Sequence, residues 1–319
     1  MEEKKQPMPP RHPAHVLAKM EKRRRMIRTI LLCLPVIALS VVLGIWIGSN
    51  SGKSNPTEPP PPVTTTAPPE TTVPPDAWKT NILRSDEIPC NSDGSYVINP
   101  ILYPVFGSDY QRKQISAVTF LDTLSGAPVD AWDVSEAGDG SVMAWVEPDG
   151  DLYRLTIAGE GGVSAGTSCR DLFAGYYSMT QISFGGNFHT DAVQDMSHMF
   201  LSCEALTSLD LSSFDTAAVQ DMSEMFWNCC ALTSLELGSF DTAAVQDMSY
   251  MFEYCPSLTS LDLSSFDTSA VQNMRRMFYK CSSLTSLDLS EKFVTTNANT
   301  FEMFLNCPAG EKYQHLLND

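Results

Sequence analysis

Apolar residues recur with a fixed spacing along the second half of the chain. The recurring unit begins at phenylalanine, and four copies start at Phe188, Phe214, Phe240 and Phe266, so the period is 26 residues. A degenerate fifth copy ends at Cys307. A fixed period between about 20 and 50 residues is typical of a repeat array whose units bury their apolar faces only against their neighbours. The pattern therefore predicts a solenoid.

One half of each unit predicts a short strand. In LTSLDLSS the apolar residues are Leu206, Leu209 and Leu211, which is the L-x-x-L-x-L pattern of a leucine-rich repeat. Side chains alternate between the two faces of a strand. We therefore expect Leu209 and Leu211 in the core, with Ser208 and Asp210 on the outer face.

The other half of each unit predicts one or two turns of helix. In DMSEMF, Asp221 is suited to cap a first helical turn, and Glu224 three residues later completes a capping-box pattern. Met222, Met225 and Phe226 then fall on one helical side. Each coil is expected to contain a strand, a turn at Phe-Asp-Thr and a short helix.

These residues resemble a known family. The second and third copies carry the string M-S-x-M-F-x-x-C-x-x-L-T-S-L-D-L-S-x-F-D-T almost intact, which is similar to the leucine-rich repeats of the BspA-like bacterial surface proteins. The resemblance extends upstream through Val105 to Val146, which looks like the lead-in segment of that family. The fourth copy departs from it at Asn273 and Arg275, and the fifth lacks the leucine strand. The resemblance implies a surface protein used in adhesion or host interaction.

The chain before the repeats predicts a membrane anchor and a stalk. Nine Lys or Arg and three Glu occupy residues 1–28, and residues 29–48 are uncharged and largely apolar, long enough for a transmembrane helix. The basic leader places the N-terminus in the cytoplasm and the C-terminal part outside the cell membrane. A cleaved signal peptide is the alternative. Residues 49–76 are rich in Pro and Thr and predict an extended linker.

The remaining chain is expected to form one ectodomain. Residues 77–168 carry strand patterns at 117–121, 141–147 and 152–158, the last two flanking a turn, and predict a β-rich N-terminal cap. Residues 169–310 form the leucine-rich repeat array, and 311–319 form a C-terminal tail. The predicted fold class is a leucine-rich-repeat solenoid with a mostly β N-terminal cap, behind a single transmembrane helix and a Pro/Thr-rich stalk.

The net charge of the chain limits the kinds of binding partner that we expect. The formal net charge is −17, and after residue 28 the chain holds 12 Lys and Arg against 35 Asp and Glu. No basic cluster follows the leader, so we expect no nucleic-acid binding. An acidic ectodomain favours basic partners or cations.

Cysteine recurs once per unit at one position of the repeat. These residues predict a buried structural ladder of stacked thiols: Cys203, Cys229, Cys255, Cys281 and Cys307. A single cysteine every 26 residues lacks the short spacing of a metal site, and we expect no metal. Cys90, Cys169 and Cys230 lie outside the ladder, and a Cys90–Cys169 disulfide remains one alternative.

The sequence shows no catalytic constellation, so we expect neither an enzyme nor a cofactor. His189 and His198 share the first unit but occupy variable positions, and both are expected at the solvent-exposed surface. Asp215, Asp241 and Asp267 of the F-D-T motifs are expected to bond their own backbone in turns.

The candidate ligand-binding residues lie on the outer face of the predicted strands. They are the acids Asp210, Glu236, Asp262 and Asp288 with the flanking serines Ser208, Ser234, Ser260 and Ser286. Neighbouring strands lie about 4.8 Å apart, so the four acids would form a line. The hypothesis is an anionic stripe for a basic peptide, an amine-bearing glycan or a bridging cation. The alternative is that duplicated repeats simply inherited the acid.

The predicted function is a membrane-anchored cell-surface binding protein for adhesion or for host, matrix or wall interaction, with a protein or glycan ligand. Two alternatives remain. One is a non-catalytic structural spacer of the envelope, and the other is an envelope sensor that signals through the transmembrane helix.

Overall fold

The structure is a computed structural model that describes residues 76–91, 96–97 and 99–318. The predicted leader and transmembrane helix, and the predicted linker up to residue 75, lie outside this part of the chain. Within it, no helix has the length and apolar character needed to cross a bilayer.

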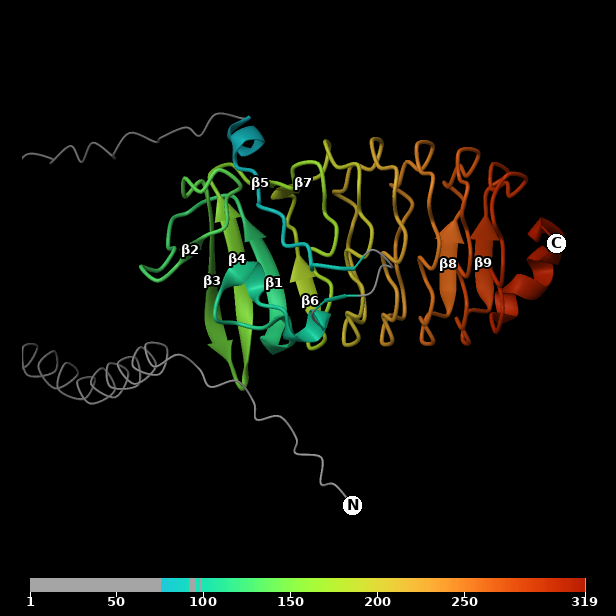
Figure 1. The fold of residues 1–319 in the computed structure, drawn as a ribbon, viewed down its shortest axis with the longest axis horizontal. Coiled ribbons are helices and arrows are strands. Elements are labelled where there is room, and N and C mark those ends of the chain that lie inside the picture. Colours follow the sequence, from blue (N-terminus) through green and yellow to red (C-terminus); the bar gives the residue numbers. More distant parts are fainter. Residues whose placement is uncertain (1–75, 92–95, 98, 319) are drawn as a thin grey trace, which may run out of the picture. The chain divides into compact units, whose positions relative to one another are not determined.

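A mixed five-stranded sheet forms the N-terminal part of the described chain (Figure 1). Its order is β2-β3-β4-β1-β6, and the bounds are β1 Ile115–Leu121, β2 Trp132–Asp133, β3 Val142–Asp149, β4 Leu152–Gly159 and β6 Gln181–Ser183. β3 and β4 form the hairpin that the sequence predicts, with Gly150 at a φ of 63° in its turn. β1 pairs in parallel with β4 and with β6, which already belongs to the predicted array.

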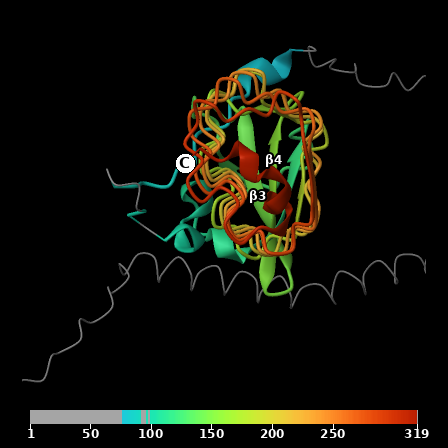
Figure 2. The same cartoon turned by 90° about the vertical axis from the view of Figure 1, so that its right-hand side faces the viewer.

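After β6 the chain winds in successive coils that stack in register (Figures 1 and 2). Backbone hydrogen bonds join successive coils with one recurring offset, from an N–H to the carbonyl 25 residues later. The Phe200 N–H donates to the Met225 carbonyl at 2.9 Å, and the Phe226 N–H donates to the Met251 carbonyl at the same distance. Two parallel strand pairs occur along the stack. β5 (Val163–Ser164) pairs with β7 (Phe188–His189) at its start, and β8 (Ser260–Leu263) pairs with β9 (Ser286–Leu289) in the later coils.

The predicted class, a leucine-rich-repeat solenoid with a short strand and a short helix in every coil, is wrong. Only 3-10 helices occur in the described residues, and none lies at DMSEMF. That segment is a run of turns in which Glu224 has a φ of 55° and Asn228 a φ of 60°. A left-handed residue interrupts an α-helix, so Asp221 and Glu224 form no capping box.

The left-handed residues recur once per coil in two columns. The first holds Asp171, His198, Glu224, Tyr250, Arg276 and Glu302, and the second holds Ser202, Asn228, Tyr254, Lys280 and Asn306. The spacing of apolar residues three and four apart predicts a helix. The observed turns with a left-handed residue also direct these apolar side chains into the interior. Regular strand is similarly scarce. Of the four predicted leucine strands, only those of β8 and β9 are formed.

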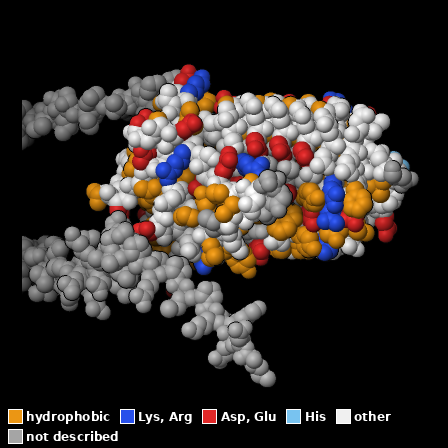
Figure 3. All heavy atoms as spheres, in the orientation of Figure 1, with side chains coloured by type: hydrophobic (Ala, Val, Ile, Leu, Met, Phe, Trp, Pro, Cys, Tyr) orange, Lys and Arg blue, Asp and Glu red, His pale blue; other side chains and the backbone are white. Residues whose placement is uncertain are grey.

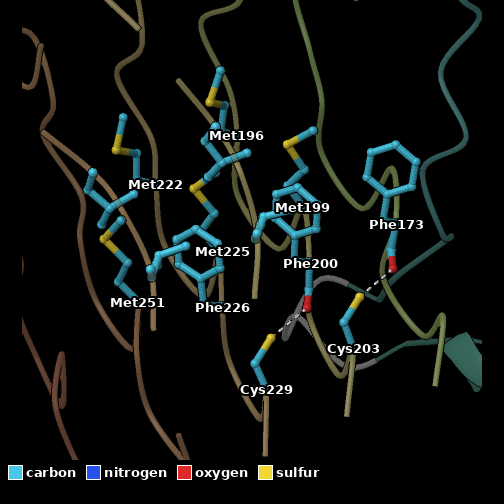
Figure 4. Close-up of a cluster of buried hydrophobic side chains, with 14 of the residues drawn as sticks. Phe173, Met196, Met199, Phe200, Cys203, Met222, Met225, Phe226, Cys229 and Met251 are labelled. Atoms are coloured by element: carbon cyan, nitrogen blue, oxygen red, sulfur yellow. Dashed lines mark hydrogen bonds between the residues drawn. The ribbon is translucent and has the colours of Figure 1, made fainter. Parts of the chain in front are cut away.

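Identical side chains stack in columns through the interior (Figure 4). Met222, Met225 and Phe226 are buried completely, like their equivalents in neighbouring coils. The Phe200 and Phe226 rings lie parallel, with centroids 5.7 Å apart. A buried threonine also links the coils, because the Thr216 hydroxyl donates to the Asp241 carbonyl at 2.9 Å.

Each end of the stack is covered by a different structure. At the C-terminal end, η5 (Pro308–Leu316) packs on the last coil, and the Tyr313 hydroxyl donates to the Leu287 carbonyl at 2.7 Å. A side chain at Gly310 would place its Cβ 2.3 Å from the Cβ of Phe304, so this close approach requires glycine. The predicted C-terminal tail is thus part of a covering element.

At the N-terminal end, the segment before β1 holds the first coil through a buried arginine, Arg112. It contains η1 (Ala77–Thr80), η2 (Pro100–Leu102), η3 (Val105–Gly107) and η4 (Arg112–Gln114). The Arg112 guanidinium lies 3.0 Å from the Asp86 carboxylate and donates to the backbone carbonyls of Asp171 and Ala174. Removal of either charge would leave the other buried and unpaired.

A second polar cluster joins this segment to the coils. The Tyr96 hydroxyl donates to Asp171 Oδ1 at 2.8 Å, and His198 Nδ1 lies 3.1 Å from the same oxygen. His198 Nε2 lies 3.7 Å from Glu224. The predicted solvent exposure of His198 is wrong, because its side chain is only 13 % exposed. His189 is also partly covered, and its ring stacks on Trp78 at 4.1 Å.

The first prediction tests the strand faces. Leu261 is buried and Ser260 is exposed. Leu261→Ala should lower the free energy of unfolding by about 2–5 kcal/mol, the usual range for a buried leucine. Ser260→Ala is the matched control and should change it by less than about 0.5 kcal/mol. Denaturant titration measures both, and equal losses would contradict the assignment of the faces.

The second prediction concerns pH. Burial alone would lower the pKa of His198, but hydrogen bonds to Asp171 and Glu224 outweigh it and raise the pKa to about 9. Because this folded-state pKa exceeds the unfolded value of about 6.5, the stabilisation is complete below pH 6.5 and is lost as the pH rises through 9.

His198→Gln should therefore destabilise the protein by about 1–3 kcal/mol at pH 6 and by much less at pH 9.5. The difference between variant and wild type isolates this histidine from other groups that titrate at high pH. A gap between the two proteins that stays constant across the pH range would show that His198 is neutral in the folded state.

Candidate ligand-binding surfaces

The predicted acidic stripe lies on the outer strand face of the coils. All four acids are exposed, and so are the four flanking serines, Ser208, Ser234, Ser260 and Ser286. Asp210 pairs with Glu236 through a parallel bridge, and Asp262 pairs with Asp288 in the β8–β9 ladder. Paired positions in a sheet lie about 4.8 Å apart, so carboxylates of successive coils are close neighbours.

Two of these acids also have a local structural role that sequence reasoning missed. Asp210 Oδ1 accepts the Ser212 N–H at 3.0 Å, and Asp262 Oδ1 accepts the Ser264 N–H at 2.8 Å. Hydrogen bonds from these serines lower the pKa of both carboxyl groups, which keeps them ionised. The D-x-S spacing was the available signal, since an Asp commonly bonds the backbone two residues ahead. A turn role explains Asp210 and Asp262 without a ligand.

The stripe ends at an open hollow between the last strand and the C-terminal helix. Thr285, Ser286 and Asp288 line one side, and Glu311 and Lys312 of η5 line the other. The lining offers both hydrogen-bond donors and acceptors. A bound ligand that follows the stripe would therefore meet polar groups at its C-terminal end.

The cysteine ladder lies inside the stack and does not contribute to a surface. Its five members, Cys203, Cys229, Cys255, Cys281 and Cys307, are buried and free. Cys203 Sγ donates to the Phe173 carbonyl and Cys229 Sγ to the Phe200 carbonyl, each at 3.2 Å (Figure 4). Burial raises the pKa of the Cys229 and Cys255 thiols well above the usual value, so these thiols are protonated and unreactive.

The three cysteines outside the ladder form no disulfide. Cys90 and Cys169 are both free, so the alternative of a disulfide between them is wrong, and Cys230 is also free.

Asp215 Oδ1 accepts the Ala217 N–H at 3.0 Å, and Asp241 and Asp267 make the equivalent bond, which confirms their predicted turn role. In the part of the chain that is described, no group of three or more His, Cys, Asp or Glu is placed to hold a metal ion.

A second surface, which sequence reasoning missed, lies on the turn side of the C-terminal coils. We call it the aromatic–cationic patch, and it comprises Tyr250, Tyr254, Arg275, Arg276, Tyr279, Lys280, Phe301 and Leu305. Orange and blue side chains lie together over these coils in Figure 3. The signal was present in the sequence, because these residues occupy the positions of M-S-x-M-F-x-x-C that vary between copies, or replace its serine.

A buried carboxyl group lies within this region. Glu253 is 5 % exposed, and burial raises its pKa to about 7 despite the nearby charges of Arg276 and Lys280. Its ionised form therefore costs stability at neutral pH. An acid whose folded-state pKa is raised stabilises the fold below its unfolded pKa and loses that contribution as the pH rises through the folded value.

The third prediction follows from this loss of stability as the pH rises. Glu253→Gln should leave the free energy of unfolding unchanged near pH 4, where the native carboxyl is protonated, and should raise it at pH 8. Glu291→Gln, at an exposed position, is the matched control and should show no such gain. Chemical denaturation at the two pH values measures both, and a loss of stability for Glu253→Gln at pH 8 would contradict the buried, unpaired carboxylate.

Comparison with known proteins gives one family match. A family model described as "Mycoplasma protein of unknown function, DUF285" matches residues 162–235 and 194–315. Both matches fall on the repeats and the segment directly before them. No curated protein and no solved structure gives a significant match.

Proposed function

We propose that the chain is a non-catalytic cell-surface binding protein of the BspA-like type, used in adhesion or in interaction with host, matrix or wall components. The repeated string from Met222 to Thr242 supports the finer family assignment beyond the family match. One observation carries the binding role. Four exposed carboxylates occupy the same strand position in four successive coils.

The ligand of the acidic stripe is a cationic peptide segment of a protein at the cell surface. Neighbouring carboxylates about 4.8 Å apart repel one another by about 1 kcal/mol in water, and an approaching cation relieves this repulsion. Glu236 and Asp288 support this role most directly. Among the described residues, neither accepts a turn hydrogen bond like that of Asp210, so a turn role does not explain them. An extended basic peptide could place successive cations along the line.

The fourth prediction uses a quadruple variant, Asp210→Asn, Glu236→Gln, Asp262→Asn and Asp288→Asn. Asparagine keeps the Oδ1 acceptor of the two turns, so the free energy of unfolding should stay the same or rise slightly as repulsion is removed. Binding of an oligolysine peptide to the full chain should weaken by at least about tenfold at low salt, because several charge-assisted contacts are lost. The salt dependence of binding should also decrease.

The matched control removes four charges elsewhere on the coils. It carries Asp191→Asn, Asp215→Asn, Asp241→Asn and Asp267→Asn, and it should bind oligolysine almost as well as the wild type. Equal weakening of both variants would mean that net charge alone attracts the peptide. Unchanged binding by the stripe variant would show that the acids are a relic of duplication, and an absence of saturable binding would favour the spacer.

A further inference from the structure

The variable positions on the turn side change in character along the stack. In the first two coils they form polar contacts with one another, such as His198 with Glu224 and Asn228 with Glu204 at 2.9 Å. In the later coils they become the aromatic–cationic patch. Arg276 still pairs with Glu302, as His198 does with Glu224, but Arg275 and Lys280 do not repeat the contacts of the first coils.

Two of the three cations of the patch, Arg275 and Lys280, lie on aromatic rings rather than in ion pairs. The Arg275 guanidinium lies 4.8 Å from the Phe301 ring centroid and 6.0 Å from that of Tyr250. Lys280 Nζ lies 4.3 Å from the Tyr254 ring centroid and 5.1 Å from that of Tyr279. Within the described residues neither cation contacts a carboxylate, whereas Arg276 pairs with Glu302 at 2.5 Å.

Cation–π contact orients the guanidinium but leaves its N–H donors unused. Among the described residues, the Arg275 side chain makes no hydrogen bond, and its Nε is buried without a partner. Lys280 Nζ donates to the Tyr254 hydroxyl and keeps further N–H groups. The patch therefore presents two positive charges with remaining donors beside ring faces. Phe301 is 52 % exposed and Leu305 is 46 % exposed, so the patch also offers apolar surface.

Positive charge is scarce elsewhere in this part of the chain. Residues 171–319 contain five Lys or Arg, and three of them, Arg275, Arg276 and Lys280, fall within six residues of sequence. Such a cluster in an acidic protein attracts a local anionic group, while the overall negative charge repels a dense polyanion. The ligand should therefore carry a few separated negative charges.

The geometry points to a second binding site, on the aromatic–cationic patch, for an oligosaccharide that contains carboxylated sugars. Arginine recognises a carboxylate through paired hydrogen bonds. Tyrosine rings pack on the apolar C–H face of a sugar ring and retain a hydroxyl for hydrogen bonding. An acidic peptide would use the cations and leave the ring faces uncovered. Single-stranded nucleic acid would use the rings, but it brings a charge at every phosphate against an acidic protein.

The fifth prediction uses a hyaluronan octasaccharide, which alternates a carboxylated sugar with a neutral one. The full chain should bind it saturably in calorimetry at low salt. It should bind the same oligosaccharide with its carboxylates reduced to alcohols at least about tenfold more weakly, because charge-assisted hydrogen bonds are lost. Arg275→Gln with Lys280→Gln should cause a similar loss.

The matched control is Lys292→Gln with Lys312→Gln, which removes two exposed cations outside the patch. It should retain nearly full affinity, as should the stripe variant, whose changes lie on the strand face. Phe301→Ser tests stacking separately at a half-exposed position and should also weaken binding. Circular dichroism checks that each variant is folded.

Several results would overturn the proposal. These are an absence of saturable binding to the octasaccharide, equal losses in the patch and control variants, or equal binding of the reduced oligosaccharide. Tighter binding of polyglutamate would assign the patch to acidic peptides instead. Tighter binding of a thymidine oligonucleotide would assign it to single-stranded nucleic acid.

Discussion

Register between successive coils is the constraint on which the rest of the structure depends. Each coil donates backbone hydrogen bonds to the next with the same offset, as Phe200 does to Met225 and Phe226 does to Met251. Every interior residue must therefore pack against its own counterpart one period away. A side chain that stacks well on itself is favoured at each position, which accounts for the columns of Phe, Met, Leu and Cys. The Cys229 thiol adds a hydrogen bond to the Phe200 carbonyl that an alanine could not make.

The same constraint creates two exposed ends, because the first and last coils lack a neighbour. The structure covers them with unrelated elements. At one end β6 joins the first coil to the mixed sheet, and Arg112 of the preceding segment donates hydrogen bonds to the Asp171 and Ala174 carbonyls of that coil. At the other end η5 places Tyr313 against Phe304, with ring centroids 6.2 Å apart. Neither element repeats, so each depends on contacts that are distant in sequence.

The register between coils also aligns exposed positions at the surface. An exposed position is repeated at each coil, so one residue type copied through the repeats forms a line, as the acids of the stripe do. Positions that vary between copies can instead build a local site. Tyr254, Lys280 and Tyr279 come together in this way on the turn side, whereas the acids lie on the strand side. The two proposed sites thus differ in charge and can be tested independently.

The sequence by itself determined the period, the alternation of Leu209 and Leu211 against Ser208 and Asp210, the β3–β4 hairpin and the turn role of Asp215, because these follow from local spacing. It did not determine the conformation of DMSEMF. A 3,4-spaced apolar pattern fits a helix and a tight turn equally, and stacking on the next coil selected the turn with Glu224 at positive φ. Burial of His198 and Glu253, and the meeting of Arg275 with Phe301, were also decided only by tertiary structure. Each depends on a neighbour in another coil or in the covering segment. The local residue pattern does not show which distant residues will lie next to a given side chain.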